Sequence, residues 1–223
     1  MIRRAFITLV GGAAAAWPIA ARAQQAVRIR RIGLLLNLSE NDLEAQRLLP
    51  AFWEGLAQLG WADGRNLRID YRWASGDIGR IRTFARELVG LSPDVIVGYG
   101  TPVVVAVQQE TRSIPILFLS VTDPVGQGLV ASLAHPGGNT TGFSIFEISV
   151  ATKWLEALKQ LAPGLKRVVT IYNPNTAPYF PLFMRAIEQA AQRLRWSRLG
   201  SKFMTMPRSS VPSARWRMKR AAD

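Results

Sequence analysis

The chain has 223 residues, 48% of them apolar, with no cysteine, one histidine and a formal net charge of +13 at pH 7. This length allows one large domain or two smaller lobes, and the lack of cysteine excludes disulfides and thiolate metal sites. The chain has a single histidine, His135, which excludes any site that needs two imidazoles. A serine triad would have to use this histidine, which lies in a Pro-Gly-Gly turn. The apolar residues are spread too evenly for a polytopic membrane protein.

The positive charge is concentrated at the two ends. Residues 1–23 carry three arginines and no acid, and residues 193–223 carry nine basic side chains against Asp223 alone. The intervening residues hold 16 basic and 14 acidic side chains and are nearly neutral. A basic nucleic-acid-binding face on the folded body is therefore not expected.

Residues 1–23 have the features of an export signal. Arg3 and Arg4 precede a moderately apolar stretch that two glycines interrupt, and an Ala-x-Ala site ends at Ala23. This order is typical of a secretory signal peptide, and the paired arginines resemble a twin-arginine signal. We expect export to the periplasm with cleavage after Ala23, by the twin-arginine or the general secretory route. An uncleaved membrane anchor is the alternative, but the apolar stretch is short for one.

Strand and helix patterns alternate regularly from residue 31 onward. A continuous apolar run over 31–37 is typical of a buried parallel strand, and apolar residues at helical spacing follow over 41–60. Further strands are expected over 67–73, 94–98, 114–119 and 139–144, and further helices over 78–91, 102–111 and 124–134. Five strands with crossing helices predict a complete, doubly wound α/β lobe over residues 24–145.

The same alternation starts again after residue 146. A helix is expected over 150–161, a buried strand over 167–172 and a helix over 176–195. These elements predict an incomplete second α/β lobe over residues 146–195, because a lobe the size of the first would extend well past residue 223. Residues 196–223 have neither helical nor strand period and are expected to form a disordered basic tail.

Several phrases of the sequence, in this order and spacing, resemble one family. They are the leader RRAFITLVGG at 3–12 with ARAQQ at 21–25, FWEGL at 52–56 with GW at 60–61, NLRIDYRWA at 66–74, DPV at 123–125 with GLV at 128–130, PGGNTTG at 136–142 and NPN at 173–175. The family is that of substrate-binding proteins of bacterial ABC transporters related to tryptophan-binding lipoproteins. The resemblance implies a two-lobed periplasmic-binding fold that closes on a small organic solute, possibly an amino acid, and delivers it to an ABC permease. It implies a monomer with no catalytic activity, cofactor or metal.

The topology independently places a binding site. In an open parallel sheet, ligands bind beyond the carboxyl ends of the strands, where helix N-termini present unpaired N–H groups. Polar residues follow three expected strands of the first lobe and one of the second. The candidate ligand-binding residues are Ser39, Tyr99, Thr101, Ser120, Thr122, Asp123, Asn173 and Asn175.

Each candidate also has a purely structural interpretation. Thr101 and Asp123 each precede a proline and are expected to cap helices, which is compatible with ligand contact. Tyr99 either stacks on a ligand or covers the end of the sheet. A solute carboxylate would suit the helix N-termini, whereas the charge of Asp123 favours an amino group.

Other classes of function remain as alternatives. A nucleotide-using α/β enzyme is a distant one, because the chain has no Walker sequence and GYGTPV at 98–103 lacks the third glycine of a dinucleotide loop. A nucleic-acid role would rest on the basic tail alone. The main alternative is a non-functional, truncated remnant of a solute-binding protein.

The tail itself has the character of an out-of-frame translation. Suppose that each codon of the original frame consists of the last base of one present codon and the first two bases of the next. The genetic code then nearly determines several of the original residues. Residues 202–205 give valine or isoleucine, then histidine or tyrosine, then aspartate, whereas residues 206–207 give alanine and residues 218–219 give glutamate. These residues suit an acidic turn that leads into an amphipathic helix. We therefore expect a one-base slip between about residues 196 and 202.

Overall fold

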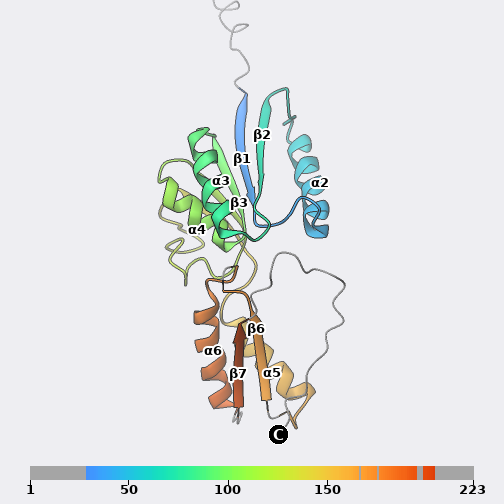
Figure 1. Cartoon of the computed structure of the whole chain (residues 1–223), viewed down its shortest axis with the longest axis vertical. Helices are drawn as coiled ribbons and strands as arrows, with labels where there is room; N and C mark the ends of the chain where they lie inside the picture. Colours follow the sequence, from blue (N-terminus) through green and yellow to red (C-terminus); the bar gives the residue numbers. More distant parts are fainter. Residues whose placement is uncertain (1–28, 166, 175, 195–197, 204–223) are drawn as a thin grey trace, which may run out of the picture.

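A computed structural model describes residues 29–165, 167–174, 176–194 and 198–203. The expected export signal, the candidate residue Asn175 and everything after residue 203 lie outside these residues. Figure 1 shows two groups of elements, one above the other, which we call the first lobe (upper) and the second lobe (lower).

The first lobe is built on a parallel sheet. Its strands are β1 (Arg30–Leu36), β2 (Leu67–Trp73), β3 (Val95–Tyr99), β4 (Ile116–Val121) and β5 (Thr140–Ser144), in the order β2-β1-β3-β4-β5. Every neighbouring pair is parallel. Leu34, Leu35 and Leu36 of β1 are all buried, because both faces of the sheet are covered.

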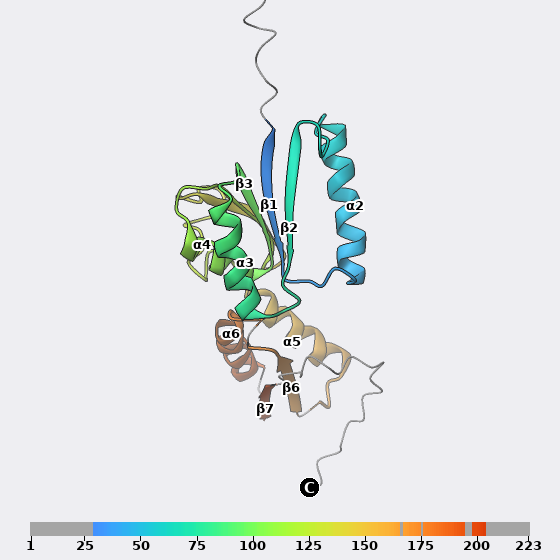
Figure 2. The same ribbon diagram turned by 45° about the horizontal axis from the view of Figure 1, so that its top comes forward.

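Three helices cover the two faces of this sheet. Figure 2 shows α2 (Leu43–Gln58) on one side and α3 (Ile78–Gly90) with α4 (Thr101–Glu110) on the other. The side chains of β1 alternate accordingly: Leu34 and Leu36 pack with α2, and Leu35 packs with α3 and α4. The predicted doubly wound α/β lobe is confirmed.

The helix expected over residues 124–134 is wrong, because this segment is a series of turns. Asp123 has a positive φ of 40° and its Oδ1 accepts a hydrogen bond from the Gly126 N–H at 3.0 Å. The N–H groups of Leu129 and Val130 both donate to the carbonyl of Pro124. Local polar bonds around two glycines thus replace the helical ladder that apolar spacing alone predicted.

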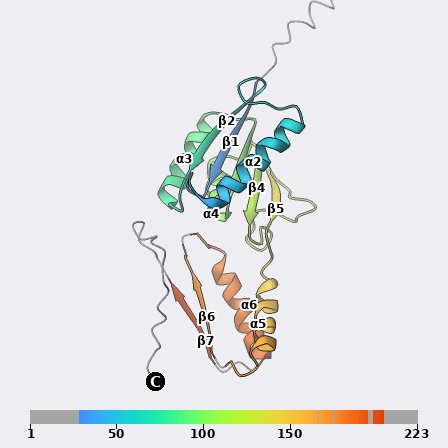
Figure 3. The same cartoon turned by 90° about the vertical axis from the view of Figure 1, so that its right-hand side faces the viewer.

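The second lobe contains α5 (Val150–Leu161), β6 (Arg167–Tyr172), α6 (Phe180–Arg193) and β7 (Arg198–Phe203). Figure 3 shows α5 and α6 together on one side of the parallel pair β6–β7. α6 begins four residues later than expected, because the Asn173 carbonyl accepts from the N–H groups of Thr176 and Ala177 and forms a turn there. β7 lies in the segment expected to be disordered, so that expectation does not hold for these six residues.

An ion pair between β1 and β2 gives the first lobe a predictable pH dependence. Arg31 Nε donates to Asp70 Oδ2 at 2.5 Å, and the Asp70 side chain is only 13% exposed. The hydrogen bond from Arg31 holds the pKa of Asp70 below its usual range. Its stabilising contribution is therefore complete above the unfolded value of about 3.9, and it is lost as the pH falls through the lower folded value.

We expect Asp70→Asn to lower the free energy of unfolding at pH 7 by about 1.5 kcal/mol, because the hydrogen bond from Arg31 loses its charged acceptor. The variant should also lose less stability than the parent as the pH falls below about 4. Urea unfolding of the first lobe at several pH values measures both effects. Glu110→Gln, which breaks an ion pair with the 74% exposed Arg86, should change stability by less than about 0.5 kcal/mol. Equal losses in the two variants would contradict the assignment.

Candidate functional site

The carboxyl ends of three adjacent strands meet at one edge of the first lobe. Leu36 of β1 pairs with Tyr99 of β3, which in turn pairs with Leu119 of β4. Two backbone hydrogen bonds continue this register, from Asn37 N–H to the Tyr99 carbonyl and from Gly100 N–H to the Leu119 carbonyl. In Figure 1 the strands run downward and end at the side of the sheet that faces the second lobe.

Tyr99 stands at the middle of this edge, at the end of β3. Its hydroxyl donates to the carboxylate of Glu44, in the first turn of α2. Burial raises the pKa of the Tyr99 phenol, the hydrogen bond to Glu44 raises it further, and a hydrogen bond with Ser120 lowers it. The half-buried ring is therefore a neutral hydrogen-bond donor that is held in place by α2.

Thr101 is the first residue of α4 and does not cap it. The N-cap is Gly100, whose φ of 94° favours glycine, and no side chain accepts a hydrogen bond from the N-terminus of α4. The buried Thr101 Oγ1 instead accepts from the backbone N–H of Thr122 at 3.4 Å. The capping role expected of Thr101 is thus wrong, and its hydroxyl ties the start of α4 to the end of β4.

The end of β4 has an unusual backbone. Ser120 and Asp123 both have positive φ, 56° and 40°, a conformation that costs energy for residues with a Cβ. Between them, Thr122 is buried and its carbonyl accepts from the side-chain amide of Gln127. Asp123 is half-buried and uses Oδ1 for the turn at Gly126. No helix follows Asp123, so the helix N-terminus expected there does not exist.

Ser39 lies between β1 and α2, at the same edge of the sheet. It is half-buried, and its carbonyl accepts from the Asp42 N–H at 3.1 Å. Asp42 is the N-cap of α2, and its side chain accepts from the N–H of Glu44. Ser39 therefore belongs to the turn that presents the N-cap Asp42 and Glu44, in the first turn of α2, near Tyr99.

Asn37 and Glu44 also lie at this edge, although neither was among the candidate ligand-binding residues. Asn37 Oδ1 is buried and has no hydrogen-bond partner among the described residues. A Cβ on Gly100 would stand 3.3 Å from Asn37 Cβ, so these two residues are in close contact. The position of Asn37 directly after a buried strand was a usable signal, whereas Glu44 resembles any acid in the first turn of a helix.

Asn173 lies across from this edge, in the loop that follows β6. It is half-buried and lines a hollow inside the second lobe together with Tyr172 and Phe180. The same loop reaches the first lobe: a Cβ on Gly76 would be 3.8 Å from Thr176, and Pro174 and Pro178 line a second hollow of about 240 Å³ with residues of α3 and α4. Six of the eight candidates thus gather at one edge, and Asn173 lies in the facing lobe.

Neither a cluster of metal-binding residues nor a membrane-spanning helix occurs in the described residues. They contain no group of three or more His, Cys, Asp or Glu that could hold a metal ion. Within the same ranges, no helix is both long and apolar enough to span a bilayer.

Residues 32–193 match a model of the family described as ABC transporter substrate binding protein. Residues of this chain are 39% identical, over 144 residues, to the tyrosine-binding protein of Clostridioides difficile strain R20291. Among solved structures, a conserved domain protein from Vibrio cholerae is 33% identical with a TM-score of 0.68. An ABC domain from Streptococcus pneumoniae, solved in complex with L-Trp, is 27% identical with a TM-score of 0.63.

These matches cover only part of each relative. The alignment with the tyrosine-binding protein includes 65% of this chain and 41% of the relative. The alignments with the Vibrio and Streptococcus structures include 79% and 78% of this chain and 58% and 57% of theirs. The chain therefore spans about half the length of the relatives it matches, and its fold is that of periplasmic binding proteins.

Proposed function

Because the chain belongs to the family of ABC transporter substrate-binding proteins, we propose that it captures an amino acid with an aromatic side chain at the carboxyl edge of its first sheet. Two relatives support this ligand class, since one is named for tyrosine and another was solved with L-Trp. The observation that carries the proposal is the gathering of Asn37, Tyr99 and Ser120 at one edge, opposite the second lobe.

The chemistry of this edge suits a zwitterion with an aromatic ring. The N-terminus of α4 has no side-chain cap, so its partial positive charge favours a carboxylate. The carboxylates of Glu44 and Asp123 favour an ammonium group, and the ring of Tyr99 offers an aromatic face. Approach of the second lobe would bury the solute and create the shape that a permease recognises.

This function requires neither catalysis nor a cofactor. The protein would be a periplasmic monomer, exported with cleavage after Ala23, and would deliver its solute to an ABC permease of the inner membrane. N-terminal sequencing of the exported chain tests this, since a mature form that begins at Gln24 is expected and a cytoplasmic form that retains Met1 would contradict it.

We expect L-tyrosine or L-tryptophan to stabilise the purified chain against thermal unfolding. A ligand at about 100 times its Kd stabilises a protein by about 2.7 kcal/mol. Differential scanning fluorimetry with the common amino acids and their D-enantiomers measures the effect. Tyr99→Leu should weaken binding by about 1 kcal/mol through loss of ring contact, and Tyr99→Phe, which keeps the ring, by less.

The same panel separates the alternatives. Stabilisation by ATP or NAD, and by no amino acid, would favour a nucleotide-using enzyme. A chain that no compound stabilises, in scanning fluorimetry or in calorimetric titration, would be a non-functional remnant, and the proposed function would be wrong.

A further inference from the structure

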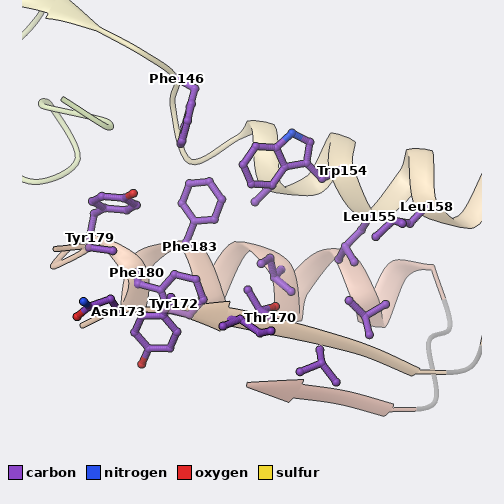
Figure 4. Close-up of a pocket in the computed structure, with 16 residues that line it drawn as sticks. Phe146, Trp154, Leu155, Leu158, Thr170, Tyr172, Asn173, Tyr179, Phe180 and Phe183 are labelled. Carbon is purple, nitrogen blue, oxygen red and sulfur yellow. The ribbon is translucent and has the colours of Figure 1, made fainter. Parts of the chain in front are cut away.

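Tyr99 lies at the carboxyl edge of the first sheet and pairs with no other aromatic ring among the described residues. The rings of the second lobe, in contrast, pack against one another. Tyr172 stacks on Phe180 with ring centroids 3.5 Å apart, and Phe183 contacts Trp154 (Figure 4). Tyr99 thus keeps its ring available for an aromatic solute, and the quality of that contact depends on where the ring is held.

Apolar packing alone does not fix the ring of Tyr99. The ring lies on the α2 side of the sheet, where it packs against the cluster that contains Leu36 and Val97. Apolar contacts have no preferred direction, so they leave the outer end of the ring, which carries the hydroxyl, without a fixed position. Other contacts must define where that end lies.

The Tyr99 hydroxyl is bonded on two sides. It donates to the carboxylate of Glu44, in the first turn of α2, and has a second hydrogen bond with Ser120, at the end of β4. The bond with Ser120 lowers the pKa of the Tyr99 phenol. A bond that the phenol oxygen accepts has this effect, because it stabilises the phenolate, so Ser120 is the donor. The single proton of each hydroxyl is therefore already used.

Both partners of the hydroxyl are themselves held by the backbone. The side chain of Asp42 caps α2 and accepts from the Glu44 N–H at 2.9 Å. Ser120 directly follows Leu119, which pairs with Tyr99, and its φ is 56°. A positive φ costs energy at a residue with a Cβ and persists where the surrounding structure imposes it. The hydroxyl is thus fixed from two separate elements, α2 and β4.

We propose that Glu44 and Ser120 are positioning residues, which set the affinity for the aromatic solute by fixing Tyr99 through its hydroxyl. This role rests on the proposed capture of an aromatic amino acid at this edge. Ser120 acts through Tyr99 and does not donate to the solute, since its proton is directed at the phenol oxygen. Glu44 has a second effect, because its charge attracts the ammonium group whether or not Tyr99 has a hydroxyl.

A double-mutant cycle separates the two effects of Glu44. Glu44→Ala should weaken binding to the full chain by roughly tenfold, but by only about threefold in the Tyr99→Phe background, where no hydroxyl remains to be held. Ser120→Ala, which keeps the Cβ, should weaken binding by about threefold in the parent and not at all in that background. Isothermal titration calorimetry measures these constants, with whichever of L-tyrosine and L-tryptophan binds more tightly.

Glu44→Gln should rescue the positioning effect. The amide keeps an oxygen that accepts from the Tyr99 hydroxyl and loses only the charge. Binding should therefore weaken by about threefold, and by the same factor with or without the hydroxyl of Tyr99. The comparison with Glu44→Ala shows how much of the affinity depends on holding the ring.

Glu54 provides the matched control on the same helix. Like Glu44 it is exposed, and its Oε1 accepts from Gln58 Nε2 at 3.4 Å along the helix surface. Glu54→Ala should leave the affinity unchanged, and circular dichroism should show all variants folded. Carbon-13 NMR of labelled tyrosine reports the bond without any solute: the Tyr99 Cζ signal, identified by its loss in Tyr99→Phe, should shift in Glu44→Ala and not in Glu54→Ala.

Two results would overturn the positioning role while the proposed function stands. An unchanged Tyr99 signal in Glu44→Ala would show that Glu44 does not hold the hydroxyl. Equal weakening by Glu44→Ala with and without the hydroxyl would show that Glu44 acts through its charge alone. If the parent chain binds neither amino acid, the proposed function is wrong, and the positioning role is wrong with it even where the signal shifts.

Discussion

Gly142→Ala should lower the free energy of unfolding of the first lobe by about 3 kcal/mol or more. Gly142 lies in β5 and pairs with Phe118 of β4. A Cβ at this position would stand 2.0 Å from the Phe118 carbonyl oxygen, a backbone atom that cannot move without breaking the pairing of the two strands. Overpacking typically costs about 1–3 kcal/mol, and disruption of the strand pair adds to it. Urea unfolding measures the loss.

Gly138→Ala is the matched control for this prediction. Gly138 precedes β5 by two residues, and a Cβ there would meet nothing within 4 Å. This variant should therefore be neutral to within about 0.5 kcal/mol. If both variants lose the same stability, the close approach of β4 and β5 is not the cause.

Sequencing the DNA of this gene should show that a one-base change of frame replaces the basic tail with an acidic turn and a helix. The residues forced by the codons of 202–207 and 218–219 all suit that helix. Residues 193–223 carry a net charge of +8 in the present frame. The glutamate and aspartate that the alternative frame gives would replace part of this basic segment with acidic residues. The family match ends at Arg193, close to the expected slip between about residues 196 and 202.

The shifted frame can be tested beyond the present tail as well. Translation of the DNA past the codon of Asp223 in the alternative frame should continue with strand and helix periods of an α/β lobe. The remaining third frame serves as the control and should show no such periods. An early stop codon in the alternative frame, or codons incompatible with the forced residues, would contradict the slip.

The regular elements could be predicted because their signals are local and strong. The sequence predicts β2, α5 and β6 with the same bounds that the structure shows, and the two faces of the sheet explain the continuous apolar runs of the strands. The segment 124–134 could not be predicted from apolar spacing. There, the hydrogen bond between Asp123 and Gly126, the missing Cβ of Gly126 and the positive φ of Gly128 decide the backbone. Periodicity carries no information about any of them.

For the candidate site, too, the position of the residues in the fold could be predicted and their contacts could not. The rule for parallel sheets predicted that Tyr99, Thr101 and Ser120 lie at the carboxyl edge of the sheet, and they do, because strand ends and topology follow from the pattern. The partners of these residues could not be predicted: Glu44 reaches Tyr99 from a helix 55 residues earlier in the chain, and Thr101 bonds to the backbone of Thr122. Such contacts depend on side-chain positions across elements, which one sequence does not specify.

The strand order of the first lobe also bears on how the protein folds. After the first pair, β1 and β2, each new strand is added to an edge that already exists: β3 beside β1, then β4 beside β3 and β5 beside β4. The sheet can therefore grow in the order in which the chain leaves the ribosome. No later strand has to insert between two earlier ones. Assembly from the amino terminus can therefore be complete once Ser144 has emerged from the ribosome, before α5 has emerged.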